Sequence, residues 1–235
     1  MNKRPCMIAH RGFSSRYPQN TALAFSMAAK NGSGGAETDI RITSDGAFVC
    51  SHDDDAVFRD GSRLLVADAT LSELRAKPLK NPKTDDDVFL CTLEEYLTVM
   101  KENGMICFIE LKGEFPDEKV REMFGICAQI YDLSKVIMQS FSFENLLKAH
   151  EMFPELPLML TYGTNERHYE RCFDCGFSID CDQFVITPEM IREFHSRGLE
   201  VALWTVNTEE DMRRCLALGV DYIESDVYGA DALTL

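Results

Sequence analysis

The sequence predicts a TIM barrel, the (β/α)8 member of the α/β fold class, with a hairpin and an insertion after the second strand. Eight short apolar runs rich in β-forming residues alternate with amphipathic stretches of helical periodicity, which is typical of a parallel barrel. The 235 residues suffice for one such barrel. Polar residues gather where the apolar runs end, and barrel enzymes carry their catalytic groups at that face.

The predicted barrel strands share short length and apolar, β-forming composition. They are Pro5–Ala9, Gly35–Asp39, Met105–Leu111, Lys135–Gln139, Leu158–Leu160, Phe177–Cys181, Glu200–Thr205 and Asp221–Glu224. A ninth apolar run, Ala47–Ser51, exceeds the eight that a barrel needs. Because Asp45-Gly46 favours a tight two-residue turn, we expect this run to return antiparallel to Ile40–Ser44, outside the barrel.

The predicted helices fill the segments between these strands. They are Asn20–Asn31, Leu93–Asn103, Pro116–Tyr131, Phe143–Met152, Glu166–Cys175, Pro188–Arg197 and Thr208–Leu218. Two of them begin with helix-capping signals. Thr187 precedes Pro188, as an N-cap precedes a proline in the first turn, and Thr208 with Asp211 resembles a capping box. Gly198 and Gly219 follow as stop signals.

We interpret residues 1–235 as one barrel domain with a small insertion at about 40–91. From roughly Asp53 to Cys91 the insertion is charged and irregular, interrupted by Gly61, Pro78 and Pro82. Long loops in compact domains are usually functional, so we expect a lid or a substrate subsite here.

The composition is that of a globular protein with a sizeable core, since 45% of the residues are hydrophobic and 27% are charged. The formal net charge of -15 repels nucleic acid and anionic membranes. We therefore expect no nucleic-acid partner and no stable membrane association. An anionic substrate would need a local positive site, which a bound cation can supply.

The nine cysteines fit buried thiols in a reducing compartment better than a disulfide framework. Several lie inside apolar runs: Cys6, Cys50, Cys107 and Cys127. Cys172 and Cys175 form a CxxC pair without a second zinc-ligand set or a redox context. Lys3 and Arg4 precede no apolar run of sufficient length, so we expect no signal peptide, no transmembrane helix and a cytoplasmic location.

Three carboxylates follow or end two of the predicted strands. Glu37 and Asp39 are two residues apart and face the same side of an extended strand, and Glu110 ends the next barrel strand. Such a cluster repels itself unless a proton or a cation intervenes, and hard cations such as Mg²⁺ or Ca²⁺ prefer oxygen ligands. The alternative is a salt-bridged barrel interior that uses Arg41 or Lys112.

Two histidines converge on the same space. His10 follows the first strand, and a two-residue turn at Asp45-Gly46 places His52 opposite Asp39. Because histidine titrates near neutral pH, the pair suits general acid–base catalysis at a phosphate. Arg11 and Lys112 beside them can bind phosphate oxygens, balance the carboxylates, or both. The remaining histidines are expected at the surface: His150, His168 and His195.

The sequence resembles the glycerophosphodiester phosphodiesterase family over nearly its whole length. The motifs that carry the resemblance are His10-Arg11-Gly12, Pro18-Gln19-Asn20-Thr21, Glu37-x-Asp39, Thr43-x-Asp45-Gly46, His52-Asp53, Glu110-x-Lys112, Gln139-Ser140-Phe141 and Trp204-Thr205-Val206-Asn207. The resemblance implies a TIM barrel with one divalent cation, Mg²⁺ or Ca²⁺. It implies the metal ligands Glu37, Asp39 and Glu110 and the catalytic pair His10 and His52.

The resemblance also maps Arg11 and Lys112 onto phosphate-contacting positions. Trp204 then forms an apolar wall under the glycerol or fills the barrel. Gln19 departs from the usual glutamate and removes a charge near His10. The last strand, Tyr222 to Asp226, and the insertion also match weakly, which leaves the preferred headgroup open.

The expected reaction is metal-dependent hydrolysis of a small-molecule glycerophosphodiester to sn-glycerol 3-phosphate and an alcohol. A lysophospholipase D-type or phosphoinositide-type phosphodiesterase is one alternative, against which the acidic charge and the polar insertion argue. A catalytically silent barrel used for binding is another; the complete histidine and carboxylate set argues against it, and Gln19 alone favours it. Which histidine is the acid, whether a cyclic phosphate forms first, and the oligomeric state stay open.

Overall fold

The computed structural model describes residues 4–164 and 168–234, and it confirms the predicted TIM barrel. Eight parallel strands close because β1 pairs with both β2 and β11. In ring order the strands are β1 (Cys6–Ala9), β2 (Gly35–Ile42), β6 (Ile106–Leu111), β7 (Val136–Ser140), β8 (Leu158–Tyr162), β9 (Ser178–Asp182), β10 (Val201–Trp204) and β11 (Tyr222–Ser225). Each predicted run falls on one of these strands, and the largest difference is that β2 continues to Ile42.

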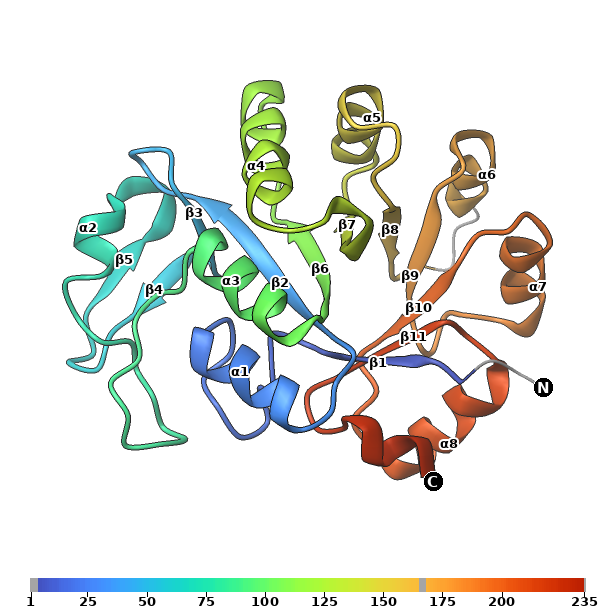
Figure 1. Cartoon of the computed structure of the whole chain (residues 1–235), viewed down its shortest axis with the longest axis horizontal. Coiled ribbons are helices and arrows are strands. Elements are labelled where there is room, and N and C mark those ends of the chain that lie inside the picture. The colour runs from blue at the N-terminus through green and yellow to red at the C-terminus, as the bar shows by residue number, and fades with distance from the viewer. Residues whose placement is uncertain (1–3, 165–167, 235) are drawn as a thin grey trace.

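Helices surround the barrel (Figure 1). They are α1 (Ala22–Lys30), α3 (Leu93–Asn103), α4 (Asp117–Ile130), α5 (Phe143–Met152), α6 (Arg171–Cys175), α7 (Pro188–Ser196) and α8 (Glu209–Leu218). The predicted caps are present, since the hydroxyls of Thr187 and Thr208 accept hydrogen bonds from backbone amides of the first turns. The start of the helix predicted at Glu166–Cys175 lies outside the described residues; the remainder divides into a 3-10 turn (His168–Glu170) and the short α6.

The core has two parts that the barrel wall separates. Large side chains pack between the strands and the surrounding helices, among them Phe25, Tyr96, Phe124 and Phe194. A smaller apolar layer fills the inside of the barrel: Ile8, Phe108, Ile137, Met159 and Ala202. Side chains two residues apart on a strand share a face. The residue two positions after each member of this layer therefore also points into the barrel, nearer to the C-terminal ends of the strands.

The hairpin after β2 is present, but its predicted register is wrong by one residue. β3 (Phe48–Cys50) pairs antiparallel with β2 so that Ile40 faces Cys50 and Ile42 faces Phe48. The turn has three residues, not two: the amide of Gly46 donates to the carbonyl of Thr43, and Gly46 has a φ of +85°. Such a turn ends in a glycine bulge, which shifts the pairing. Ser51 therefore faces Asp39, whose carbonyl accepts the Ser51 amide, and His52 lies beyond the regular strand.

The insertion is more ordered than the irregular loop that its composition predicts. It contains β4 (Asp55–Val57), β5 (Arg63–Leu65), a 3-10 turn (Val66–Asp68) and α2 (Leu71–Leu74). These elements lie together on the outer side of β2 and β3 (Figure 1). They bury a small core of their own, separate from that of the barrel: Val49, Ala56, Phe58, Val66, Ala69, Leu74 and Leu90.

Two further observations concern the chain as a whole. None of the helices in the described part of the chain has both the length and the apolar character needed to cross a bilayer. All nine cysteines are free thiols, and seven of them are buried.

Candidate active site

The site lies at the C-terminal ends of the barrel strands, directly above the inner apolar layer. Each layer residue is followed two positions later by a residue that lines a pocket of about 110 Å³. Thus Ile8 precedes His10, Phe108 precedes Glu110, Ile137 precedes Gln139, Met159 precedes Thr161, and Ala202 precedes Trp204. The alternation of the strands therefore stacks a polar ring on an apolar floor.

The three predicted carboxylates come together as the strand pairing requires. β2 and β6 are neighbours, and Asp39 stands opposite Glu110 in their register. Oxygens of Glu37, Asp39 and Glu110 all lie within 4.8 Å of one another, and all three side chains are buried. This arrangement fits a hard cation, because it offers carboxylate oxygens from three side chains and leaves Glu37 Oε1 without a hydrogen-bond partner among the described residues.

Two cationic side chains balance part of this charge. Lys112 Nζ lies 2.9 Å from Asp39 Oδ1 and 2.7 Å from Glu110 Oε1, while Arg11 Nε lies 3.3 Å from Asp39 Oδ2. Burial alone would raise the pKa of Asp39, but Lys112, Arg11 and the amide of Asn20 lower it below its ordinary value. Asp39 is therefore the member of the cluster that is held ionised.

The pKa of Glu37 moves in the opposite direction. Burial raises it, and the neighbouring Asp39, Glu224 and Glu110 carboxylates raise it further. The pKa of Glu110 is raised as well, by burial and by Asp39, against the opposing effect of Lys112. A bound divalent cation would reverse this tendency, since opposite charge stabilises the ionised form.

The backbone around Arg11 completes the pocket wall. Arg11 and Asn20 both have left-handed backbones, with φ of 56° and 55°. The Arg11 amide thereby donates to Glu37 Oε2 at 2.9 Å, and the Asn20 amide group donates to Asp39 Oδ2 at 2.7 Å. Gln19 contacts Arg11 rather than His10, because its Oε1 accepts from Arg11 Nη1 at 3.1 Å.

Both predicted catalytic histidines line the pocket, and an aspartate contacts each one. His10 Nδ1 lies 2.8 Å from Asp226 Oδ1, and His52 Nδ1 lies 2.8 Å from Asp53 Oδ1. An ionised carboxylate only accepts hydrogen bonds, so Nδ1 is the donor in each pair when the aspartate is ionised, and Nε2 stays outside the pair. His52 reaches the site although it does not stand opposite Asp39, because the chain bends after β3.

Asp226 had no assigned role in the sequence, and barrel closure explains its position. β11 pairs with β1 so that Ala9 faces Ser225, which places the next residues, His10 and Asp226, side by side. Ser14 and Asn207 also donate to the Asp226 carboxylate, at 2.6 Å each. Although burial raises its pKa, the contacts with His10, Ser14 and Asn207 lower it well below the ordinary value. The order of the strands around a closed barrel was the signal that could have revealed this pair.

Trp204 ends β10 and lines the pocket beside Phe141. Its Nε1 donates to the carbonyl of Asp180 at 3.2 Å, and its ring meets Phe141 edge-on at 6.0 Å. His150, His168 and His195 are exposed, as predicted. A second pocket of about 290 Å³ lies between the barrel and the insertion, and His52 lines both pockets.

Fold and site together place the chain among barrel enzymes that cleave phosphate diesters. Residues 10–230 match the sequence model described as "Glycerophosphoryl diester phosphodiesterase family". The chain belongs to this family, as the motifs of its sequence indicated.

Two curated relatives agree with that assignment, and a solved structure shares the fold. The chain is 29% identical over 227 residues to a glycerophosphodiester phosphodiesterase of Caldanaerobacter subterraneus subsp. tengcongensis, covering 94% of this chain and 93% of the relative. It is 30% identical over 232 residues to one of Bacillus altitudinis, with 94% of each chain covered. Its fold matches an Oleispira antarctica phosphodiesterase solved with the product sn-glycerol-3-phosphate, at a TM-score of 0.84, 22% identity and coverage of 95% and 93%.

Proposed function

We propose that this phosphodiesterase hydrolyses glycerophosphodiesters to sn-glycerol 3-phosphate and an alcohol, using one divalent cation and a histidine acid–base pair. The observation that carries the proposal is the convergence, in one pocket, of the Glu37–Asp39–Glu110 cluster with two histidines that each contact an aspartate. The relatives named above act on this class of substrate, and the whole chain would work as one barrel domain.

In this mechanism the cationic side chains bind the phosphate and the acidic side chains bind the metal ion. Arg11 and Lys112 hold the anionic phosphate at the pocket mouth, and Glu37, Asp39 and Glu110 would hold Mg²⁺ or Ca²⁺. When bound, the cation supplies charge stabilisation to the phosphoryl oxygens. The Nε2 atom of one histidine takes the proton of the attacking hydroxyl, and that of the other protonates the leaving oxygen. The attacking hydroxyl belongs to water or to the glycerol of the substrate.

The alcohol headgroup would occupy the pocket between the barrel and the insertion. That pocket adjoins His52, and residues of the insertion line its outer side, including Asp55, Lys80 and Lys83. Trp204 and Phe141 offer an apolar wall for the glycerol carbons. We place the reaction in the cytoplasm, because nine free thiols suit a reducing compartment.

The test measures release of sn-glycerol 3-phosphate from a panel of glycerophosphodiesters, before and after exhaustive chelation. We expect activity to vanish on chelation and to return with Mg²⁺, Mn²⁺ or Ca²⁺. Full activity in protein that elemental analysis shows to be metal-free would contradict the metal requirement. No product from any member of the panel, in metal-loaded protein, would contradict the substrate class.

A further inference from the structure

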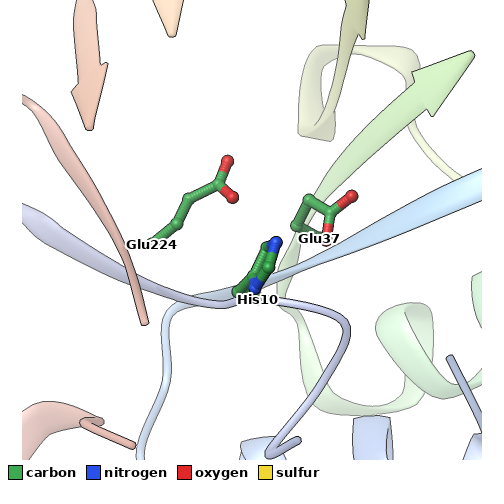
Figure 2. A group of neighbouring side chains, drawn as sticks. All are labelled: His10, Glu37 and Glu224. Atoms are coloured by element: carbon green, nitrogen blue, oxygen red, sulfur yellow. The ribbon is translucent and has the colours of Figure 1, made fainter. Parts of the chain in front are cut away.

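Two buried acids at the pocket floor take no part in the proposed mechanism. Asp180 on β9 and Glu224 on β11 are 0% and 1% exposed, and both line the same pocket as the carboxylate cluster. Figure 2 shows Glu224, Glu37 and His10 reaching into one space from β11, β2 and the end of β1, which are neighbours in the barrel. Burying a carboxylate inside a barrel without a partner costs folding free energy, so two such residues call for an explanation.

The oxygens that surround this space lack hydrogen-bond partners among the described residues. Neither carboxylate oxygen of Asp180 has one, and the same holds for Glu37 Oε1, Gln139 Oε1 and Thr161 Oγ1. Glu224 receives only a long contact of 3.4 Å from Gln139 Nε2. A buried group of oxygens with so few donors is a set of ligands for a hard cation, which prefers carboxylate and neutral oxygen together.

The charge count points the same way. Five buried carboxylates meet here, Glu37, Asp39, Glu110, Asp180 and Glu224, and two cationic side chains, Arg11 and Lys112, face them. With all five ionised, three negative charges remain, so a single divalent cation leaves the pocket negative. A second divalent cation would make it positive, which suits an anionic phosphodiester.

The geometry supplies a second position that shares one residue with the first. Ligand atoms of Glu37, Glu224 and His10 all lie within 4.8 Å of one another, separately from the Glu37–Asp39–Glu110 group. Glu37 Oε2 accepts the Arg11 amide, whereas Oε1 is free to contact an ion. A carboxylate common to two positions is typical of sites with two metals roughly 3.5–4 Å apart.

We propose that the barrel holds a second divalent cation between Glu37 and Glu224, with the buried carboxylate of Asp180 lining the same pocket. A nitrogen of His10 belongs to the same group of atoms, but a hard cation prefers the carboxylate oxygens, and water would complete its shell. The inference rests on the proposed function only in that Glu37 would serve both ions.

The experiment counts bound ions. Chelated protein is dialysed against Mn²⁺ alone, without substrate, and bound Mn²⁺ per chain is measured together with its electron paramagnetic resonance spectrum. We expect two Mn²⁺ per chain with the signature of a coupled pair. Asp180→Asn and Glu224→Gln should each bind one and lose the coupling, and the exposed control Glu151→Gln on α5 should bind two.

A thermal shift gives a readout that does not depend on counting. Without metal, Asp180→Asn should melt higher than the wild type, because it removes an unpartnered buried acid, and it should gain less from added Mn²⁺. One Mn²⁺ per wild-type chain, or an unchanged count in both Asp180→Asn and Glu224→Gln, would overturn the proposal. Glu110→Gln tests the first site separately, because it should lose the ion bound by Glu37, Asp39 and Glu110. If Glu110→Gln loses an ion while Asp180→Asn and Glu224→Gln lose none, the second site is refuted and the proposed function stands.

Discussion

The imidazoles of His10 and His52 are the residues on which the proposed chemistry depends most. The leaving alkoxide must gain a proton, and the attacking hydroxyl must lose one. Removal of either imidazole therefore costs about 10²- to 10⁴-fold in turnover. We expect His10→Ala and His52→Ala to fold, to keep bound metal and to lose kcat on that scale. A nitrophenyl ester, whose leaving group needs no proton, should restore only the variant that lacks the acid. Near-normal kcat on a natural diester in either variant would show that histidine to be structural.

In the proposed mechanism Asp226 would act only through His10, as a positioning residue. Its carboxylate contacts His10 Nδ1 at 2.8 Å and fixes which nitrogen faces the pocket. Asp226→Asn should lower kcat on the order of 10- to 100-fold and leave KM unchanged. Ser14→Ala is the matched control, because it removes a different hydrogen bond to the same carboxylate. Equal losses in the two variants, or a shared drop in melting temperature, would indicate that Asp226 only stabilises the loop.

At the scale of elements, α3 begins with a capping box that also ties the insertion to the barrel. Thr92 and Glu95 cap each other's amides, and Arg75 of the insertion lies 2.7 Å from Glu95 Oε2. Burial raises the pKa of Glu95, but Arg75 and the Thr92 amide lower it below its ordinary value overall. A lowered folded-state pKa stabilises the fold above the unfolded pKa, and this stabilisation is lost as the pH falls through the folded value.

Glutamine can still form the capping box and the lost ion pair is partly exposed, so Glu95→Gln should destabilise the protein by only about 0.2–1 kcal/mol near neutral pH. The difference in unfolding free energy from the wild type should narrow as the pH falls through the lowered pKa of Glu95. Denaturant unfolding at several pH values measures both. The exposed Glu94→Gln on the same helix serves as the control. A difference that is constant with pH would mean that the charge of Glu95 contributes nothing to the fold.

The elements also show what the sequence could and could not predict. Strand positions were predictable because alternating apolar runs are local, whereas the hairpin register depended on whether Asp45-Gly46 closes a turn of two or three residues. That single choice moved His52 off the partner position of Asp39. The order within the insertion was missed because its core draws single apolar residues from separate short segments, such as Val49, Phe58 and Leu74.

Long-range closure set the other limit on prediction. The carboxylates on β2 and β6 could be grouped because the strands are neighbours in a barrel and the spacing of Glu37 and Asp39 is visible in the sequence. The contact of His10 with Asp226 joins residues 216 positions apart and follows only from the closure of β1 on β11. Asp180 and Glu224 stood in the predicted polar ring, but their burial, and the lack of hydrogen-bond partners for Asp180 among the described residues, became evident only in three dimensions.

At the scale of the whole molecule, the separate core of the insertion makes it replaceable. We expect a variant in which a short linker replaces residues 54–90, with Val49 changed to a polar residue, to keep a folded barrel, because it spares Asp53 beside His52 and Cys91 in the barrel core. It should hydrolyse glycerophosphodiesters with an altered preference for the alcohol, because one wall of the headgroup pocket is gone. Initial rates on a matched panel of headgroups measure the change. An unchanged profile in a folded variant would show that the barrel alone selects the substrate.

The apolar layer beneath the carboxylates has a consequence for the order in which ligands arrive. A floor of low dielectric, made by Ile8, Phe108, Ile137, Met159 and Ala202, prevents the field of the acids from spreading into the barrel and directs it outward. In the metal-free protein this field attracts cations and repels a phosphate diester. We therefore expect ordered binding, in which the ion binds first. Its charge changes the electrostatic interaction of the barrel mouth with the anionic substrate from repulsion to attraction.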